Sequence, residues 1–107
     1  MFKFTADPKF AHPVTVCAPV DGGFKEQTFR ATFRVIPVDE LGDTATLEGQ
    51  KQLLTRIVCG FEDLVDDAEQ PLPYSDELRS QLIAVPYVRA ALVQTYLQAV
   101  TKIKLGN

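Results

Sequence analysis

The sequence predicts an α+β fold in which an N-terminal antiparallel β-hairpin, of two to three strands, packs on about three helices. Three observations predict it: apolar residues alternate along residues 28–35, a turn sequence precedes them at Asp21-Gly22-Gly23, and helical periodicity follows from residue 43. The 107 residues, 46% hydrophobic and 23% charged, fit one domain with one core. We therefore expect a single domain, 1–107, with a β-hairpin region at 1–36 and a helical region at 43–105.

The first residues alternate between apolar and polar side chains from Phe2 to Thr5. This alternation predicts either a short third strand or an arm laid on the core. Asp7-Pro8 ends that segment, because the residue before a proline is restricted and proline has no amide hydrogen.

The hairpin is predicted from two alternating stretches joined by a turn. Val14, Val16 and Ala18 alternate with other residues and predict a strand that ends at Pro19. Asp21-Gly22-Gly23 supplies the backbone freedom that a tight reversal needs. The return strand directs one set of side chains to the core, namely Phe29, Ala31, Phe33 and Val35, and Thr28, Arg30, Thr32 and Arg34 to solvent. A sheet of two or three strands would leave an exposed edge, either blunted by Arg and Thr or available to a partner.

The middle of the chain predicts one amphipathic helix and one acidic connection. Pro37 ends the sheet, and Asp43 or Thr44 can cap a helix that runs to about Val58. Gly60 then stands where a C-terminal helix glycine is common. The segment 61–73, FEDLVDDAEQPLP, lacks helical periodicity and predicts a loop or a small hairpin.

The end of the chain, 74–105, carries the longest helical signal. Ser75 predicts an N-cap, and Pro86 predicts a break at Val85 with a new helix starting at Pro86, or else one kinked helix. Apolar side chains of the last helix span roughly 200°, wider than the ~100° stripe of an ordinary surface helix. They include Val88, Leu92, Val93, Tyr96, Leu97, Ala99, Val100 and Ile103. The width predicts either a nearly enclosed helix or one with an additional partner.

Composition argues against several functions. A net charge of −3 and a pI near 5.0 give no basic footprint for nucleic acid. Cys17 and Cys59 match no zinc or redox spacing, and His12 is the only histidine. The acidic residues of 62–69 lack the spacing of a calcium loop, so no catalytic residue, metal or cofactor is expected. No leader and no membrane span are recognised, which predicts a cytoplasmic protein.

Four stretches together resemble the tail assembly chaperones of long-tailed bacteriophages and prophages. They are MFKFTADPKF, VTVCAPVDGGFKEQTFRATFR, LLTRIVCGFEDLVDDAEQPLPYSDELRSQL and VPYVRAALVQTYLQAVTKIKLGN. The third is the most specific, since it joins Ile57-Val58, Gly60-Phe61, an acidic turn from Asp63 to Glu69, and Pro73-Tyr74-Ser75. The chain departs from the family pattern at Phe61, where Trp is common, and at Ala68, where a turn Gly is common.

The resemblance implies a non-enzymatic chaperone that binds the tape measure protein and the tail tube protein in the host cytoplasm. Such a protein is absent from the mature virion, and the sequence leaves a homo-oligomer open. The candidate partner-binding residues lie on the last helix: Tyr87, Arg89, Leu92, Val93, Tyr96, Leu97 and Val100. Arg89 has three interpretations: an ion pair with Asp76 or Glu77, a side chain extended to water, or an interface contact. Two alternatives to the chaperone remain, another phage structural or connector module, and a metal-dependent enzyme that uses the acidic loop.

Overall fold

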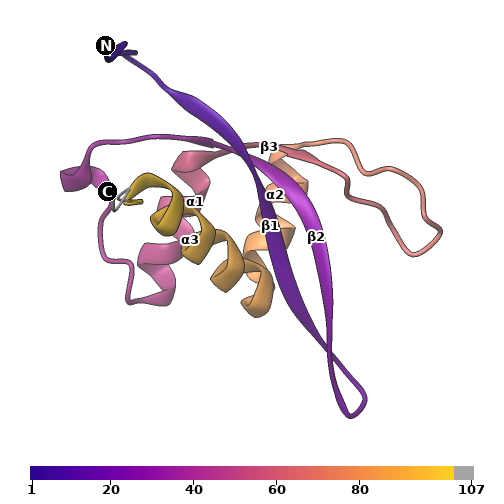
Figure 1. Ribbon diagram of the computed structural model, residues 1–107. Coiled ribbons are helices and arrows are strands. Elements are labelled where there is room, and N and C mark those ends of the chain that lie inside the picture. The colour runs from indigo at the N-terminus through magenta and orange to yellow at the C-terminus, as the bar shows by residue number, and fades with distance from the viewer. Residues whose placement is uncertain (103–107) are drawn as a thin grey trace, which may run out of the picture.

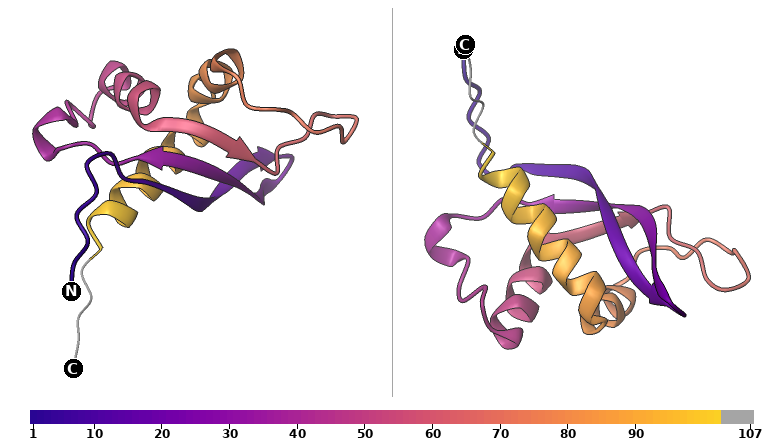
Figure 2. Two further views of the ribbon diagram at one scale, coloured as in Figure 1. Left: turned by 90° about the horizontal axis from the view of Figure 1, so that it is seen from above. Right: turned by 60° about the horizontal axis from the view of Figure 1, so that its bottom comes forward.

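The computed structural model describes residues 1–102 as an α+β fold with a three-stranded antiparallel sheet and three α-helices, which confirms the predicted fold class (Figure 1). The strands, in spatial order, are β1 (Lys9–Val20), β2 (Gly23–Arg34) and β3 (Val58–Glu62). The helices are α1 (Leu47–Ile57), α2 (Asp76–Ala84) and α3 (Pro86–Val100), with a short 3-10 helix, η1, at Val38–Glu40. Helix α3 packs diagonally against β1, and α1 packs against β2 and β3 (Figure 2).

The β1–β2 hairpin forms as the alternation predicts. Its register runs from Lys9↔Arg34 to Val20↔Gly23, and Gly22 takes a φ of 80° in the turn. A φ in this range favours glycine, since a Cβ atom would crowd the backbone. The side chains predicted to face the core from the return strand include Phe29, Ala31 and Phe33, and all three are buried.

The third strand is not the one that the sequence predicted. Residues Phe2 to Thr5 form neither a strand nor a packed arm, and the side chains of Phe2 and Phe4 are 85% and 82% exposed. Instead β3 pairs with β2 along Arg30 to Phe33, where it also buries Phe61 in the core. This strand lies inside the range 43–105 that the sequence assigned to helices.

Helix α1 starts later than predicted and ends close to Val58, as predicted. Thr46, rather than Asp43 or Thr44, is the N-cap, and its Oγ1 accepts a hydrogen bond from the Gly49 amide at 3.0 Å. The helix ends at Ile57, and Gly60 lies in β3 instead of ending the helix. A Cβ atom at Gly60 would lie 3.3 Å from the Thr32 side chain across the sheet, so this glycine serves close strand packing.

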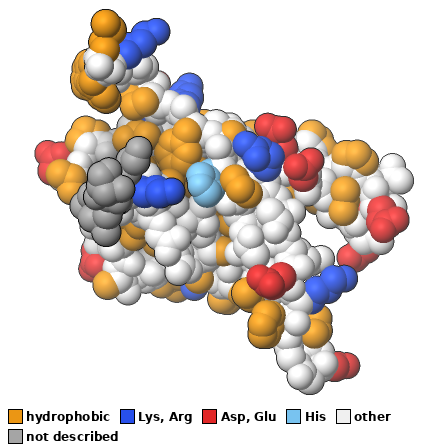
Figure 3. Space-filling model, viewed as in Figure 1, with side chains coloured by type: hydrophobic (Ala, Val, Ile, Leu, Met, Phe, Trp, Pro, Cys, Tyr) orange, Lys and Arg blue, Asp and Glu red, His pale blue; other side chains and the backbone are white. Residues whose placement is uncertain are grey.

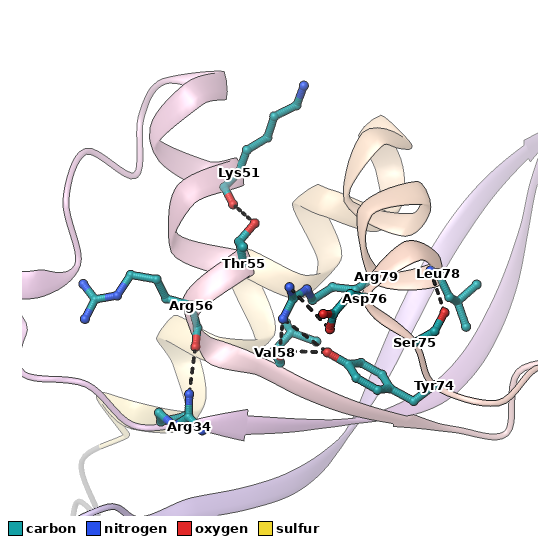
Figure 4. A network of polar contacts seen from close by, with 10 residues as sticks. All are labelled: Arg34, Lys51, Thr55, Arg56, Val58, Tyr74, Ser75, Asp76, Leu78 and Arg79. Carbon is teal, nitrogen blue, oxygen red and sulfur yellow. Dashed lines mark hydrogen bonds and ion pairs between the residues drawn. The ribbon is translucent and has the colours of Figure 1, made fainter.

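A polar network holds the junction between α1 and β3 (Figure 4). The Val58 carbonyl accepts hydrogen bonds from the Tyr74 hydroxyl at 3.3 Å and from Arg79 Nη1 at 3.2 Å. Arg79 also pairs with Asp76 at 3.7 Å. A carbonyl freed by a helix end needs such partners when it is removed from water. The network therefore fixes the point where the chain returns from the acidic segment 63–73 into α2.

The last two helices begin as predicted. Ser75 caps α2 by accepting the Leu78 amide at 3.0 Å, and α3 starts at Pro86. Val85 between them is extended, with φ −83° and ψ 119°, so the chain breaks into two helices rather than one kinked helix. Helix α3 ends at Val100, and the predicted continuation through Ile103 to residue 105 lies outside the described residues.

Two aromatic groups organise the core. Phe10, Phe33 and Tyr96 have ring centroids 5.4 to 6.3 Å apart, and Tyr96 Oη accepts the Ile36 amide at 3.2 Å. Phe61 lies 5.7 Å from Phe29 and 5.3 Å from Tyr74. Such spacings are typical of favourable aromatic pairs. The first group joins α3 to the hairpin, and the second joins β3 to the start of α2.

Candidate partner-binding groove

The candidate residues of α3 are mainly part of the core. Leu92 and Tyr96 are 0% exposed and Val93 is 8% exposed, so the expectation that their apolar side chains face a partner is wrong. Leu97 and Val100 are half-buried and pack against the same core. The reason is that the hairpin lies over one side of α3 while α1 and α2 contact it elsewhere. The wide apolar arc therefore belongs to a nearly enclosed helix, which was one of the two predicted alternatives.

Arg89 and Tyr87 occupy different environments. Arg89 Nε donates to Gln50 Oε1 at 3.1 Å, and Nη1 donates to the Ile83 carbonyl at 3.4 Å. Arg89 therefore ties α1 to the α2–α3 corner, and the predicted ion pair with Asp76 or Glu77 does not form. Tyr87 is 40% exposed, the largest exposure among the seven candidates, and it lines a groove.

The groove lies between the hairpin, the acidic segment and the α2–α3 corner, and encloses about 600 Å³. Its lining comes from β1, β2, the segment 63–67 and residues 82–88: Val16, Gln27, Thr28, Phe29, Asp63, Leu64, Val65, Asp67, Leu82, Val85, Tyr87 and Val88. We call this set the apolar groove. Val16, Phe29 and Val88 form its buried floor, while Val65 and Tyr87 are exposed at 54% and 40%. Core side chains are therefore slightly exposed at the floor of the groove, and larger apolar groups are exposed at its sides.

One rim of the apolar groove is acidic. Asp63 and Asp67 line the groove. Three further carboxylates lie in or next to the same segment: Glu62, Asp66 and Glu69. Among residues 1–102, no ion pair involves a carboxylate of 62–69. Figure 3 shows hydrophobic and acidic side chains gathered together on this projecting segment. Carboxylates that form no ion pair within residues 1–102, lying beside exposed apolar groups, favour a partner that carries both apolar and basic side chains.

The acidic segment is a small hairpin, which was one of its two predicted forms. Leu72 donates its amide to the Leu64 carbonyl at 2.8 Å, and Val65 and Pro71 form an isolated bridge. Asp66 Oδ1 accepts the amides of Ala68 and Gln70 at 2.9 and 3.0 Å. Glu69, with φ 60°, supplies the left-handed residue, so the turn forms without glycine at Ala68. These bonds hold the rim in a defined shape.

The outer edge of β1 was the other predicted contact surface. Val35 donates to the Pro8 carbonyl at 3.0 Å, so by strand alternation the odd-numbered residues of β1 direct their backbone groups away from β2. Pro13 and Pro19 both fall at these outward positions. Each leaves the ladder to β2 intact and removes one outward donor. Proline, rather than Arg and Thr, therefore blunts this edge against pairing.

Other classes of site find little support in the part of the chain that the structure describes. No group of three His, Cys, Asp or Glu side chains there could hold a metal ion. No helix within 1–102 has both the length and the hydropathy needed to cross a membrane. His12 is exposed on β1 and contacts the Pro13 carbonyl through Nδ1 at 3.0 Å.

Of the seven candidate partner-binding residues, only Tyr87 lines the apolar groove, while Asp63 and Asp67 belong to the acidic cluster that the sequence offered as a possible docking surface for a basic partner. The available signal was the apolar pair Leu64-Val65 inside an acidic segment, of which the structure leaves Val65 54% exposed. Searches against protein-family models, curated proteins and solved structures find no match to this chain.

Proposed function

We propose that this protein is a tail assembly chaperone of a long-tailed bacteriophage or prophage, and that its apolar groove binds an amphipathic helical segment of the tape measure protein. The assignment to tail assembly comes from the sequence resemblance. The observation that supports binding at this place is the exposed Val65 and Tyr87 beside a rim of carboxylates without ion-pair partners among the described residues.

The chemistry of the groove suits such a segment. An amphipathic helix lays its apolar face into a groove with anchors three or four residues apart. Its flanking Lys or Arg side chains then meet Asp63 and Asp67 on the rim. Tape measure proteins are long and helical, and a chaperone that covers their apolar stripe keeps them soluble until tube subunits arrive. The protein acts in the host cytoplasm, recruits the tail tube protein and leaves the finished tail.

Tyr87→Asp tests the groove directly, with Leu47→Asp as its matched control. Both residues are exposed apolar side chains in the first turn of a helix, 40% and 52% exposed, where an aspartate suits the helix dipole. Neither change should alter the free energy of unfolding by more than about 0.5 kcal/mol. Only Tyr87 lines the groove. We expect Tyr87→Asp to weaken binding to the tape measure protein of the same phage at least about 10-fold, as loss of a central aromatic anchor does.

Equal affinity of wild type, Tyr87→Asp and Leu47→Asp for the tape measure protein, measured by titration calorimetry, would overturn the groove as the binding site. Mass spectrometry of purified virions tests the class of protein. A chaperone is present in infected cells and missing from virions, whereas a connector or tube component is found in both.

A further inference from the structure

Strand β3 covers only part of β2, so β2 keeps an unpaired stretch on that side. The pairing of the two strands runs from Arg30 to Phe33, and β3 ends at Glu62. Asp63 then has a φ of 66°, which is not the geometry of a strand, and Figure 1 shows the hairpin and the acidic segment separating beyond this point. Residues 23–29 of β2 therefore pair with β1 alone. We call residues 24–28 the free edge.

Three residues of the free edge direct their backbone groups away from β1. Backbone groups along β2 alternate between its two neighbours, and the Thr32 carbonyl accepts the Cys59 thiol of β3 at 3.5 Å. Even-numbered residues of β2 therefore face the β3 side. Phe24, Glu26 and Thr28 present their amides and carbonyls there, where no strand pairs with them in the part of the chain that the structure describes.

The free edge lacks the protection against pairing that the outer edge of β1 has. Proline stands at two outward positions of β1, Pro13 and Pro19, and none stands in β2. A row of unpaired backbone groups is a template for an added strand. Antiparallel pairing of the whole free edge with a second copy would set Glu26 opposite Glu26, and like charges at directly opposite positions destabilise a sheet. The edge therefore favours a strand with a basic side chain at that position.

We propose that the free edge binds an extended segment of another protein as a fourth strand of the sheet. Successive side chains of such a strand alternate between the two faces of the sheet. Those on the core face lie beside Phe29 and enter the apolar groove. Those on the outer face lie beside Glu26, which forms no ion pair within residues 1–102. The segment that fits this edge thus alternates apolar residues with lysine or arginine.

The proposal goes beyond the binding of a helix in the apolar groove and does not depend on it. Thr28 and Phe29 belong both to β2 and to the lining of the groove. An added strand and the tape measure helix would therefore compete for the hairpin side of the groove.

Thr28→Pro and Thr15→Pro form a matched pair of variants. The two threonines are exposed and lie opposite each other in the hairpin, and either change breaks the hydrogen bond between their hydroxyl groups at 3.2 Å. Both amides point away from the β1–β2 ladder, so proline at either position removes no bond between these strands. Only Thr28→Pro removes a donor from the free edge.

The probe is a capped peptide of alternating valine and lysine residues, titrated into the purified protein and followed through the backbone amide resonances of β2. Wild type and Thr15→Pro should bind it with the same dissociation constant. Thr28→Pro should bind it at least about 10-fold more weakly, because a backbone donor is lost and the proline ring obstructs the added strand. The same peptide methylated at every amide nitrogen keeps its side chains but cannot pair, so it should not bind.

Strand addition would be overturned if wild type did not bind the peptide, or if Thr28→Pro or the methylated peptide left the affinity unchanged. A wild-type dimer that Thr28→Pro dissociates would also overturn it, because a second copy would then occupy the free edge. The titration uses no tape measure protein. Its failure would therefore leave the proposed function standing, and the loss of tape measure binding would leave strand addition standing.

Discussion

In helix α3 and in the acidic rim of the apolar groove, the exposure of apolar side chains is the opposite of what the sequences suggest. Helix α3 is the most apolar segment of the chain, and its central residues Leu92 and Tyr96 are completely buried. Residues 61–73, the end of β3 and the acidic segment, carry five carboxylates, yet this stretch presents the exposed Val65. The comparison teaches that an apolar side chain is available to a partner only where the neighbouring elements leave it uncovered. Apolar width on one helix does not by itself indicate an interface.

The difference has a simple geometric cause. A small domain buries about two thirds of the surface that its unfolded chain exposes. The element nearest the centre of the domain is buried most completely. Helix α3 contacts the hairpin, α1 and α2, so its wide arc is used within the domain. Figure 1 shows that the hairpin and the acidic segment extend past the helices, and residues from both line the groove.

Among the variants that compare the two regions, Leu92→Ala in helix α3 should lower the free energy of unfolding the most. Leu92 is 0% exposed in the centre of the core, so its truncation removes buried apolar area and leaves a cavity. We expect the free energy of unfolding to fall by about 2 to 5 kcal/mol in chemical denaturation. A loss below about 0.5 kcal/mol would mean that α3 is not enclosed.

A smaller loss is expected from Tyr96→Phe, which keeps the ring and removes the hydroxyl. The Ile36 amide then loses its acceptor at 3.2 Å in a half-buried place. The expected cost is about 1 to 2 kcal/mol of unfolding free energy. Thermal denaturation checks it, and Tyr74→Phe provides a comparison, because the Val58 carbonyl would keep the bond from Arg79.

Much of the fold could be predicted because its signals are local. Alternation in the return strand, the turn at Gly22, the cap at Ser75 and the start of α3 at Pro86 each depend on a few adjacent residues. Strand β3 could not be predicted in this way. Val58 to Glu62 is extended because β2 offers it an edge and because Tyr74 and Arg79 hold the Val58 carbonyl, and all of these contacts are distant in sequence.

The candidate site was harder to predict, for the same reason. Helical periodicity indicates which residues of α3 share a face, but it does not say how many neighbours cover that face. Tyr87 was a candidate because tyrosine is amphipathic and enriched at interfaces, yet the residues opposite it come from β1, β2 and the acidic segment. The groove exists only after these elements have packed.

Hydrogen exchange of backbone amides, with and without the tape measure protein, tests the central claim most directly. The account predicts slower exchange upon binding in residues 63–67 and 82–88, which line the apolar groove, and unchanged exchange on the solvent-facing side of α1. Protection confined to α1, or to the outer edge of β1, would contradict it.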